Sequence, residues 1–166
     1  MEIRGEKDEI LAREMLVGAS DRAAAIVAVA YVEDKLTSAI RTCLKSDKDA
    51  FQRLFKPTGP LGPMGAKLQL GYLLSLYSKE FRDDLEILAK VRNDFAHWAE
   101  PATFDHKEIR IKAEALGFQT RLFGPGDYST KPFKNGIARF VFISTADMMA
   151  GHLSAIAKYP DHPRVL

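Results

Sequence analysis

The stretch SDRAAAIVAVAYVEDKL, residues 20–36, decides the fold. Ser20 can cap a helix N-terminus, and Asp21 places an acidic side chain in the first turn. The run at residues 23–32 is apolar on every side of a helix, so we expect it to be buried in a core. The apolar spacing then continues in steps of three and four. A long core helix is therefore predicted from Ser20 to about Lys45.

The same run bears on the location of the protein. It is the longest apolar run in the chain, and it is far shorter than the roughly 20 residues that cross a bilayer. Residues 1–9 are mostly charged, whereas a secretory signal needs an apolar stretch and a small-residue cleavage site. The single Cys43 cannot form an intrachain disulfide, and its place in a helical pattern predicts a packed thiol. These features predict a cytoplasmic protein without a membrane partner.

Further helices are predicted outward from this segment, at residues 2–17, 47–55, 63–77, 78–98, 104–116 and 137–159. The helix at 63–77 is expected at the centre of the core, because its apolar residues wrap most of its circumference. Residues 140–143 have strand propensity, but the length of the last segment favours a helix. With no internal repeat and no linker, residues 1–166 are expected to form one domain, an all-α bundle of about six or seven helices.

Prolines recur every third residue between two of these helices. Pro57, Pro60 and Pro63 occur among Gly59 and Gly62. A stiff connection is the simpler interpretation, and the spacing also suits a polyproline II face for a partner. The phosphate-binding pattern G-x-x-x-x-G-K-[ST] is not met, because the chain contains no Gly-Lys pair.

Composition and charge narrow the classes of partner. The chain has 166 residues, of which 46% are hydrophobic and 28% charged, enough for a sizeable core. A formal net charge of +2 does not by itself indicate a nucleic-acid partner. The C-terminal third is the more basic part, and Lys107, Arg110 and Lys112 are its candidate phosphate contacts. A solvated surface of mixed charge explains the same residues, so contact with DNA or RNA is left open.

One charged residue falls inside an apolar stripe. In the helix at 78–98 the apolar positions follow steps of four and three, and the missing member of the series is Arg92. At about 100° per residue, Arg92 lies only about 20° from Phe81 around the helix. A guanidinium there needs an acidic or anionic partner, because an unpaired buried charge is costly. Arg92 is therefore a candidate functional residue.

Two polar residues follow Arg92 along the same helix. Asn93 and His97 are four apart and share a face, whereas Arg92 and His97 diverge by about 140° on a straight helix. Arg92 and His97 converge only if the helix unwinds near Phe95, or if two subunits build the site together. The structural alternative pairs Arg92 with a carboxylate of the bundle, while Asn93 and His97 satisfy the helix C-terminus. The residues alone leave both interpretations open.

The string RNDFAH at residues 92–97 is an R-x4-H motif with a polar residue after the arginine. It resembles the signature of the HEPN superfamily of small helical domains. For an active member, the resemblance implies metal-independent RNA cleavage, in which His97 transfers protons, Arg92 stabilises charge on the phosphorane and Asn93 orients His97. Trp98 would then stack a base, although a core position explains it as well.

A wider resemblance covers residues 20–116. The blocks DRAAAIVAVAYVEDKL at 21–36, PLG at 60–62 with KLQLGYLL at 67–74, and VRNDFAH at 91–97 occur in order. Together they are similar to the mannitol operon repressor family. This resemblance implies an all-α bacterial transcriptional regulator that acts through protein partners and has no helix-turn-helix. The sequence agrees, since it predicts no short helix pair with a basic second helix.

Other chemistry has little support in the sequence. His106, His152 and His162 lack the spacing of a zinc site, so no metal and no cofactor are predicted. We expect a regulatory or interaction module that forms a homodimer and binds a regulatory protein partner. The alternative is a metal-independent endoribonuclease that uses Arg92 and His97, and the sequence leaves enzymatic activity undecided.

Overall fold

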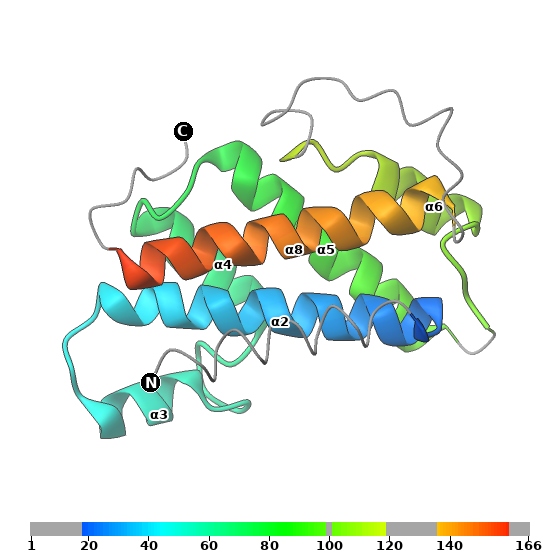
Figure 1. Ribbon diagram of the computed structural model, residues 1–166. Helices are drawn as coiled ribbons and strands as arrows, with labels where there is room; N and C mark the ends of the chain where they lie inside the picture. The colour runs from blue at the N-terminus through cyan, green and yellow to red at the C-terminus, as the bar shows by residue number, and fades with distance from the viewer. Residues whose placement is uncertain (1–17, 99–100, 119–135, 160–166) are drawn as a thin grey trace.

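The computed structural model describes residues 18–98, 101–118 and 136–159, and within these ranges all regular structure is helical (Figure 1). The predicted helix at residues 2–17 lies outside the described residues. The six described helices confirm the prediction of an all-α bundle. They are α2 (Asp21–Thr42), α3 (Lys48–Phe55), α4 (Met64–Leu73), α5 (Lys79–His97), α6 (Lys107–Glu114) and α8 (Ile137–Lys158).

Three of these helices have a polar N-cap side chain at the position where the sequence predicted the helix to start. A capping side chain accepts a hydrogen bond from a backbone N–H that has no partner within the helix, and it typically contributes about 1 kcal/mol. The three caps are Ser20 Oγ with Ala23 N (3.2 Å), Asp47 Oδ1 with Ala50 N (2.9 Å) and Ser78 Oγ with Phe81 N (3.2 Å).

The two longest helices, α2 and α8, lie side by side through the middle of the bundle (Figure 1). Small side chains are buried on both, among them Ala25 and Ala28 on α2 and Ala146 and Ala150 on α8. The distance between packed helices depends on the side chains at the contact, so small residues allow a close approach. Helices α4 and α5 pack against α2, and α6 packs against α8 and α5. Helices α2 and α8 therefore form the centre of the core.

Aromatic side chains fill the core between these helices. Phe104 contacts both Phe95 and Phe142, with ring centroids 4.9 and 5.2 Å apart. Phe81 contacts Phe118 at 5.1 Å. All five side chains are at most 2% exposed, and burial of each contributes about 1.5–3 kcal/mol. The contacts of Phe104 with Phe95 and Phe142 join the segment before α6 to α5 and α8.

Helix α8 is long and apolar enough, by length and composition alone, to cross a membrane. Its apolar residues have another explanation in this fold, because they pack against α2 and α6. The buried residues of α8 also include the polar side chains of Arg139 and Thr145. Helix α8 is thus a core helix of the bundle, and it confirms the predicted helix at 137–159 over the strand alternative.

Helix α4 is shorter than predicted and does not lie at the centre of the core. Its end is a Schellman motif, in which Ser75 has φ +56°, Ser75 N donates to Tyr72 O and Leu76 N donates to Gly71 O. Leu73, the last residue of α4, is 77% exposed. The continuous apolar pattern concealed this end, because serine stands at the left-handed position that glycine usually occupies.

The N-terminal half of α2 is less completely buried than predicted. Ile26 is 38% exposed, and Ala23 and Ala30 are also exposed, while α4, α5 and α8 cover the remaining faces of the helix. Cys43 is exposed as well, so the prediction of a packed thiol is wrong. The reason is that α2 ends at Thr42, before the predicted end near Lys45, which leaves Cys43 at the C-cap.

Two polar contacts hold α4 in place. Lys67 Nζ lies 2.7 Å from Glu33 Oε1 of α2, and Lys67 is only 7% exposed. The hydroxyl group of Tyr77 donates to the carbonyl oxygen of Leu68 at 2.8 Å, and burial raises the pKa of Tyr77. A Cβ at Gly71 would lie 2.4 Å from that hydroxyl oxygen, so glycine leaves the space that the tyrosine occupies.

The proline-containing connection between α3 and α4 folds into successive turns. Gly59 N donates to Lys56 O at 2.7 Å, Leu61 N to Leu54 O at 2.9 Å, and Gly62 N to Gly59 O at 3.0 Å. Polyproline II has no internal hydrogen bonds, so the suggestion of a polyproline II face is wrong. The turns bring the backbone at Gly59 against the end of α3, and the stiffness of this connection stays a prediction.

We expect Gly59→Ala to lower the free energy of unfolding by about 1–3 kcal/mol, since overpacking has that cost. A Cβ at Gly59 would lie 2.4 Å from the carbonyl oxygen of Leu54 and 2.6 Å from that of Arg53. Gly151→Ala is the matched control, because nothing lies within 4 Å of its added Cβ; it should stabilise α8 by about 0.5–1 kcal/mol. Urea denaturation measures both changes. An unchanged midpoint for Gly59→Ala would contradict the close backbone approach.

Candidate functional site

The candidate residues of the sequence lie on the last two turns of α5. The helix remains regular through His97, and Trp98 N donates to Asp94 O at 3.1 Å. Unwinding near Phe95 is therefore excluded as a way to bring Arg92 and His97 together. On a regular helix the two side chains diverge by about 140°. A site that two subunits build together stays a prediction.

Arg92 lies beside the buried stripe of α5. The residue is half-buried, and its Nε atom is fully buried without a hydrogen-bond partner among the described residues. If Arg92 has a structural role only, a carboxylate of the bundle is expected to pair with its guanidinium group. Asp94 does not provide one, because its Oδ2 lies 2.5 Å from Lys112 Nζ. Among residues 18–98, 101–118 and 136–159, no ion pair is found for Arg92.

Asn93 and His97 are both exposed. They are four residues apart on a regular helix, so their side chains lie on one face, as predicted. His97 is the basic residue of the last turn of α5, where a cationic side chain interacts favourably with the helix dipole. The roles of Arg92, Asn93 and His97 in catalysis remain predictions.

Trp98 and His106 meet just beyond α5. Their ring centroids are 4.1 Å apart, and Trp98 is half-buried. The guanidinium group of Arg22 on α2 donates to the carbonyl oxygen of Trp98. His106 is the N-cap residue of α6, although its side chain makes no capping hydrogen bond. These contacts hold Trp98 against the start of α2 and His106 against Trp98.

A buried ion pair that the sequence analysis missed lies at the start of α2. The carboxylate of Asp21 accepts hydrogen bonds from Phe104 N at 2.8 Å and from Arg139 Nη1. Arg139 Nη2 also donates to Ala19 O at 3.1 Å, and Arg139 is only 5% exposed. The available signal was the arginine within the apolar run at residues 137–143, which parallels that of Arg92. The pair joins the beginnings of α2 and α8.

The three basic residues predicted to contact phosphate are not equivalent on α6. Lys107 and Arg110 are exposed, whereas Lys112 is half-buried and bound to Asp94. The charge of Lys112 is thus balanced within the chain. Phosphate binding by Lys107 and Arg110 remains a prediction. In the part of the chain that the structure describes, no group of three or more His, Cys, Asp or Glu residues could hold a metal ion.

Comparison with known proteins addresses the fold. No protein-family model matches the chain, and no curated protein matches its sequence. A solved structure does match, a chain in the X-ray structure of the MtlR–HPr complex from Escherichia coli. The TM-score is 0.68 at 20% sequence identity, and the match covers 88% of this chain and 98% of that chain.

The fold is MtlR-like. The predicted resemblance to the mannitol operon repressor family is thereby confirmed at the level of the fold. The HEPN-like motif is not addressed by this comparison and stays a prediction. Because the match spans nearly the whole of the other chain, the complete helical arrangement, and not a fragment of it, is the shared feature.

We expect Asp21→Asn to lower the free energy of unfolding by about 2 kcal/mol, because it removes the carboxylate charge that Arg139 Nη1 contacts at the start of α2. The side chain of Asp21 is 22% exposed, so the loss should be smaller than that of a fully buried pair. Asp83→Asn is the control. Hydrogen bonds from Lys79 and Arg82 lower the pKa of Asp83, but this carboxylate lies at the surface. Its replacement should leave thermal unfolding nearly unchanged, and equal shifts in the two variants would contradict the assigned role of Asp21.

Proposed function

We propose that this protein is a cytoplasmic, single-domain interaction module that binds a protein partner and regulates bacterial transcription through it. The observation that carries the proposal is the match to a chain of the MtlR–HPr complex over 88% of this chain and 98% of that chain. That structure was solved as a complex with a protein, and the shared fold makes HPr the first candidate partner here.

The charge of α5 and the connection before α6 support action through a protein partner instead of direct reading of DNA. In a helix-turn-helix, a turn of about three to four residues precedes a helix that enters the major groove. Helix α5 follows α4 after a short connection, but it carries five acidic residues against four lysines and arginines. Helix α6 is separated from α5 by residues 98–106, which is too long a connection. Neither helix is suited to approach DNA in that way.

We expect titration of the chain with purified HPr to give a saturable heat with a dissociation constant in the micromolar range or below. Isothermal titration calorimetry measures it, and a small protein of unrelated fold supplies the background heat. Absence of both binding heat and co-elution on size exclusion at about 100 µM, with folded protein, would exclude HPr as the partner and remove the main support for the proposal.

A second candidate function rests on Arg92. Its buried Nε has no hydrogen-bond partner among the described residues, and a phosphate oxygen would supply an acceptor with a compensating charge. In this alternative the protein is a metal-independent endoribonuclease that works as a homodimer. His97 of one subunit would transfer protons, Asn93 would orient it, and Arg92 of the other subunit would stabilise the phosphorane.

Cleavage of a mixed RNA pool in excess chelator separates the two candidates. If the protein is an interaction module only, the wild-type protein should leave the RNA intact. If the protein is a ribonuclease, the wild-type protein should cleave the RNA, and the rate of cleavage should fall at least about 100-fold in both Arg92→Ala and His97→Ala. Lys79→Ala, at an exposed position at the start of α5, is the matched control and should retain full cleavage. A monomer in sedimentation at tens of micromolar would contradict the composite site.

A further inference from the structure

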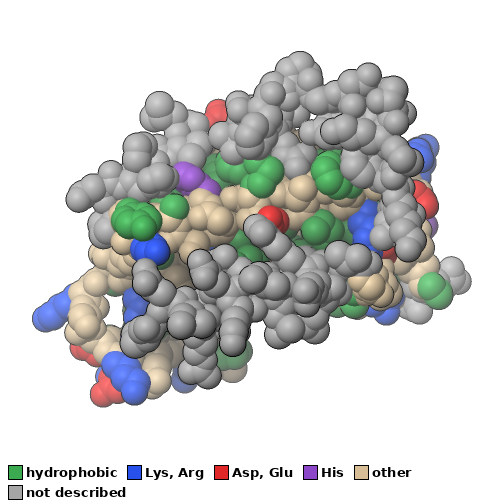
Figure 2. All heavy atoms as spheres, viewed as in Figure 1, with side chains coloured by type: hydrophobic (Ala, Val, Ile, Leu, Met, Phe, Trp, Pro, Cys, Tyr) green, Lys and Arg blue, Asp and Glu red, His purple; other side chains and the backbone are tan. Residues whose placement is uncertain are grey.

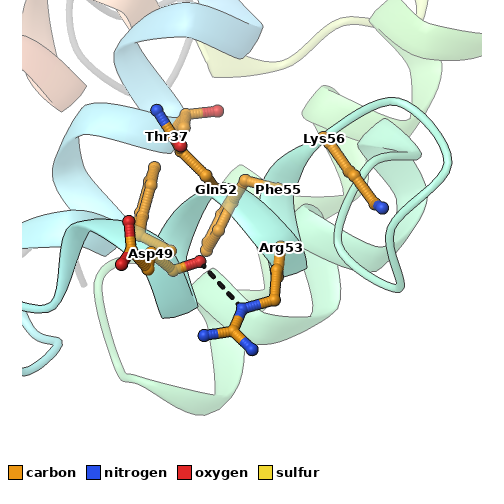
Figure 3. A pocket seen from close by; sticks show the side chains of 7 residues that line it. Thr37, Asp49, Gln52, Arg53, Phe55 and Lys56 are labelled. Carbon is orange, nitrogen blue, oxygen red and sulfur yellow. Dashed lines mark hydrogen bonds between the residues drawn. The ribbon is translucent and has the colours of Figure 1, made fainter.

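A groove lies between α2 and α3, near the C-terminal end of α2 (Figure 3). It is open to solvent, and its volume is about 810 Å³. We call it the α3 groove. The residues that line it are Thr37 of α2, Asp49, Phe51, Gln52, Arg53 and Phe55 of α3, and Lys56 just beyond α3.

The bundle leaves α3 largely uncovered. None of the residues of α3 is buried, and in Figure 1 the helix stands apart from the other described helices. The rings of Phe51 and Phe55 are stacked, with centroids 4.1 Å apart, and both are half-buried. Leu54 beside them is 40% exposed. An aromatic pair with an exposed leucine provides an apolar surface that an apolar side chain of a partner can cover.

The segment that carries the α3 groove is basic, with Arg53, Lys56 and one acidic residue, Asp49, in the lining itself. Residues 41–56 carry a net charge of +3, while the whole chain carries +2. Figure 2 shows lysine and arginine side chains gathered over this end of the molecule, at the lower left, with acidic ones among them. All five basic side chains of the segment are exposed. They are Arg41, Lys45, Lys48, Arg53 and Lys56.

Two of the basic side chains are placed to meet a carboxylate. The guanidinium of Arg41 lies over the ring of Phe51, 4.6 Å from its centroid, and a stacked guanidinium keeps its edge donors free for an anion. The side chain of Arg53 extends from α3, held at Nε by the carbonyl oxygen of Asp49 at 3.3 Å (Figure 3). The acidic side chain of Asp47 is occupied as the N-cap of α3.

An amphipathic basic helix is also a typical element for binding an anionic membrane. That mode requires the apolar side chains to face outward, into the lipid. In α3 the ring of Phe51 lies under Arg41, and Phe55 packs toward the core. Helix α3 also has only eight residues, about two turns. The rings of Phe51 and Phe55 thus line the groove and do not form an outward apolar face, although Leu54 is exposed.

We propose that the α3 groove docks an acidic peptide segment of a protein partner. One apolar side chain of that segment packs on Phe51 and Phe55, and its carboxylates bind Arg41, Arg53 and Lys56. The basic charge of residues 41–56 selects an acidic segment, and the stacked rings select one with an apolar anchor. The inference concerns a surface and a chemical class of partner, and it holds independently of the proposed binding of HPr.

A fluorescein-labelled peptide of about ten residues, with Asp and Glu around a central Leu-Phe pair, tests the proposal by fluorescence anisotropy with the full chain. Two comparison peptides carry Ser in place of the acidic residues or Gly in place of Leu-Phe. The parent peptide should bind at least about tenfold more tightly than either. The double variant Arg53→Glu with Lys56→Glu should weaken its binding at least about tenfold.

Lys79→Glu with Lys90→Glu is the matched control, since it makes the same change of charge at exposed positions of α5 and should leave peptide binding unchanged. Equal weakening in both double variants, equal binding of the serine peptide, or no binding at about 1 mM would overturn the proposal. Binding of phosphatidylserine vesicles but not of the peptide would assign the surface to a membrane. Failure of the peptide leaves the titration with HPr unaffected.

Discussion

Close packing of α2 against α8 is the contact on which α4, α5 and α6 depend. Small buried side chains on both helices allow it, and α4, α5 and α6 each pack against one member of the pair. The ion pair of Asp21 with Arg139 fixes the two helices at their first turns. The same carboxylate holds Phe104 N, so the segment that leads from α5 to α6 is positioned by the start of α2.

The parts of the fold that could be predicted are those set by local chemistry. Helix starts at Ser20, Asp47 and Ser78 follow from side chains that cap their own helix. The end of α4 could not be predicted in this way, because Ser75 takes a backbone conformation in which glycine is expected. The exposure of Ile26 was missed for another reason, since periodicity does not specify how many neighbours surround a helix.

The candidate site could be predicted only in part. The break in the apolar stripe correctly marked Arg92 as a side chain in an unusual environment, and its Nε is buried without a partner among the described residues. The contact between Asp21 and Arg139 spans most of the chain, so no local pattern identified it. The α3 groove was missed because its lining comes from two helices and the sequence pattern describes each helix alone. The sequence pattern thus predicted the helices but not the contacts between them.

The contact of α2 with α8 has a consequence for the order of folding. It joins nearly opposite ends of the described chain, so its formation requires closure of a long loop, and such non-local contacts slow folding. During synthesis, α2 leaves the ribosome long before Ile137 has been added. Its buried alanines and valines then lack the helix that covers them in the finished bundle. A nascent chain of this protein therefore exposes an apolar helical surface until α8 has been synthesised, and exposed apolar surface of this kind is what chaperones bind.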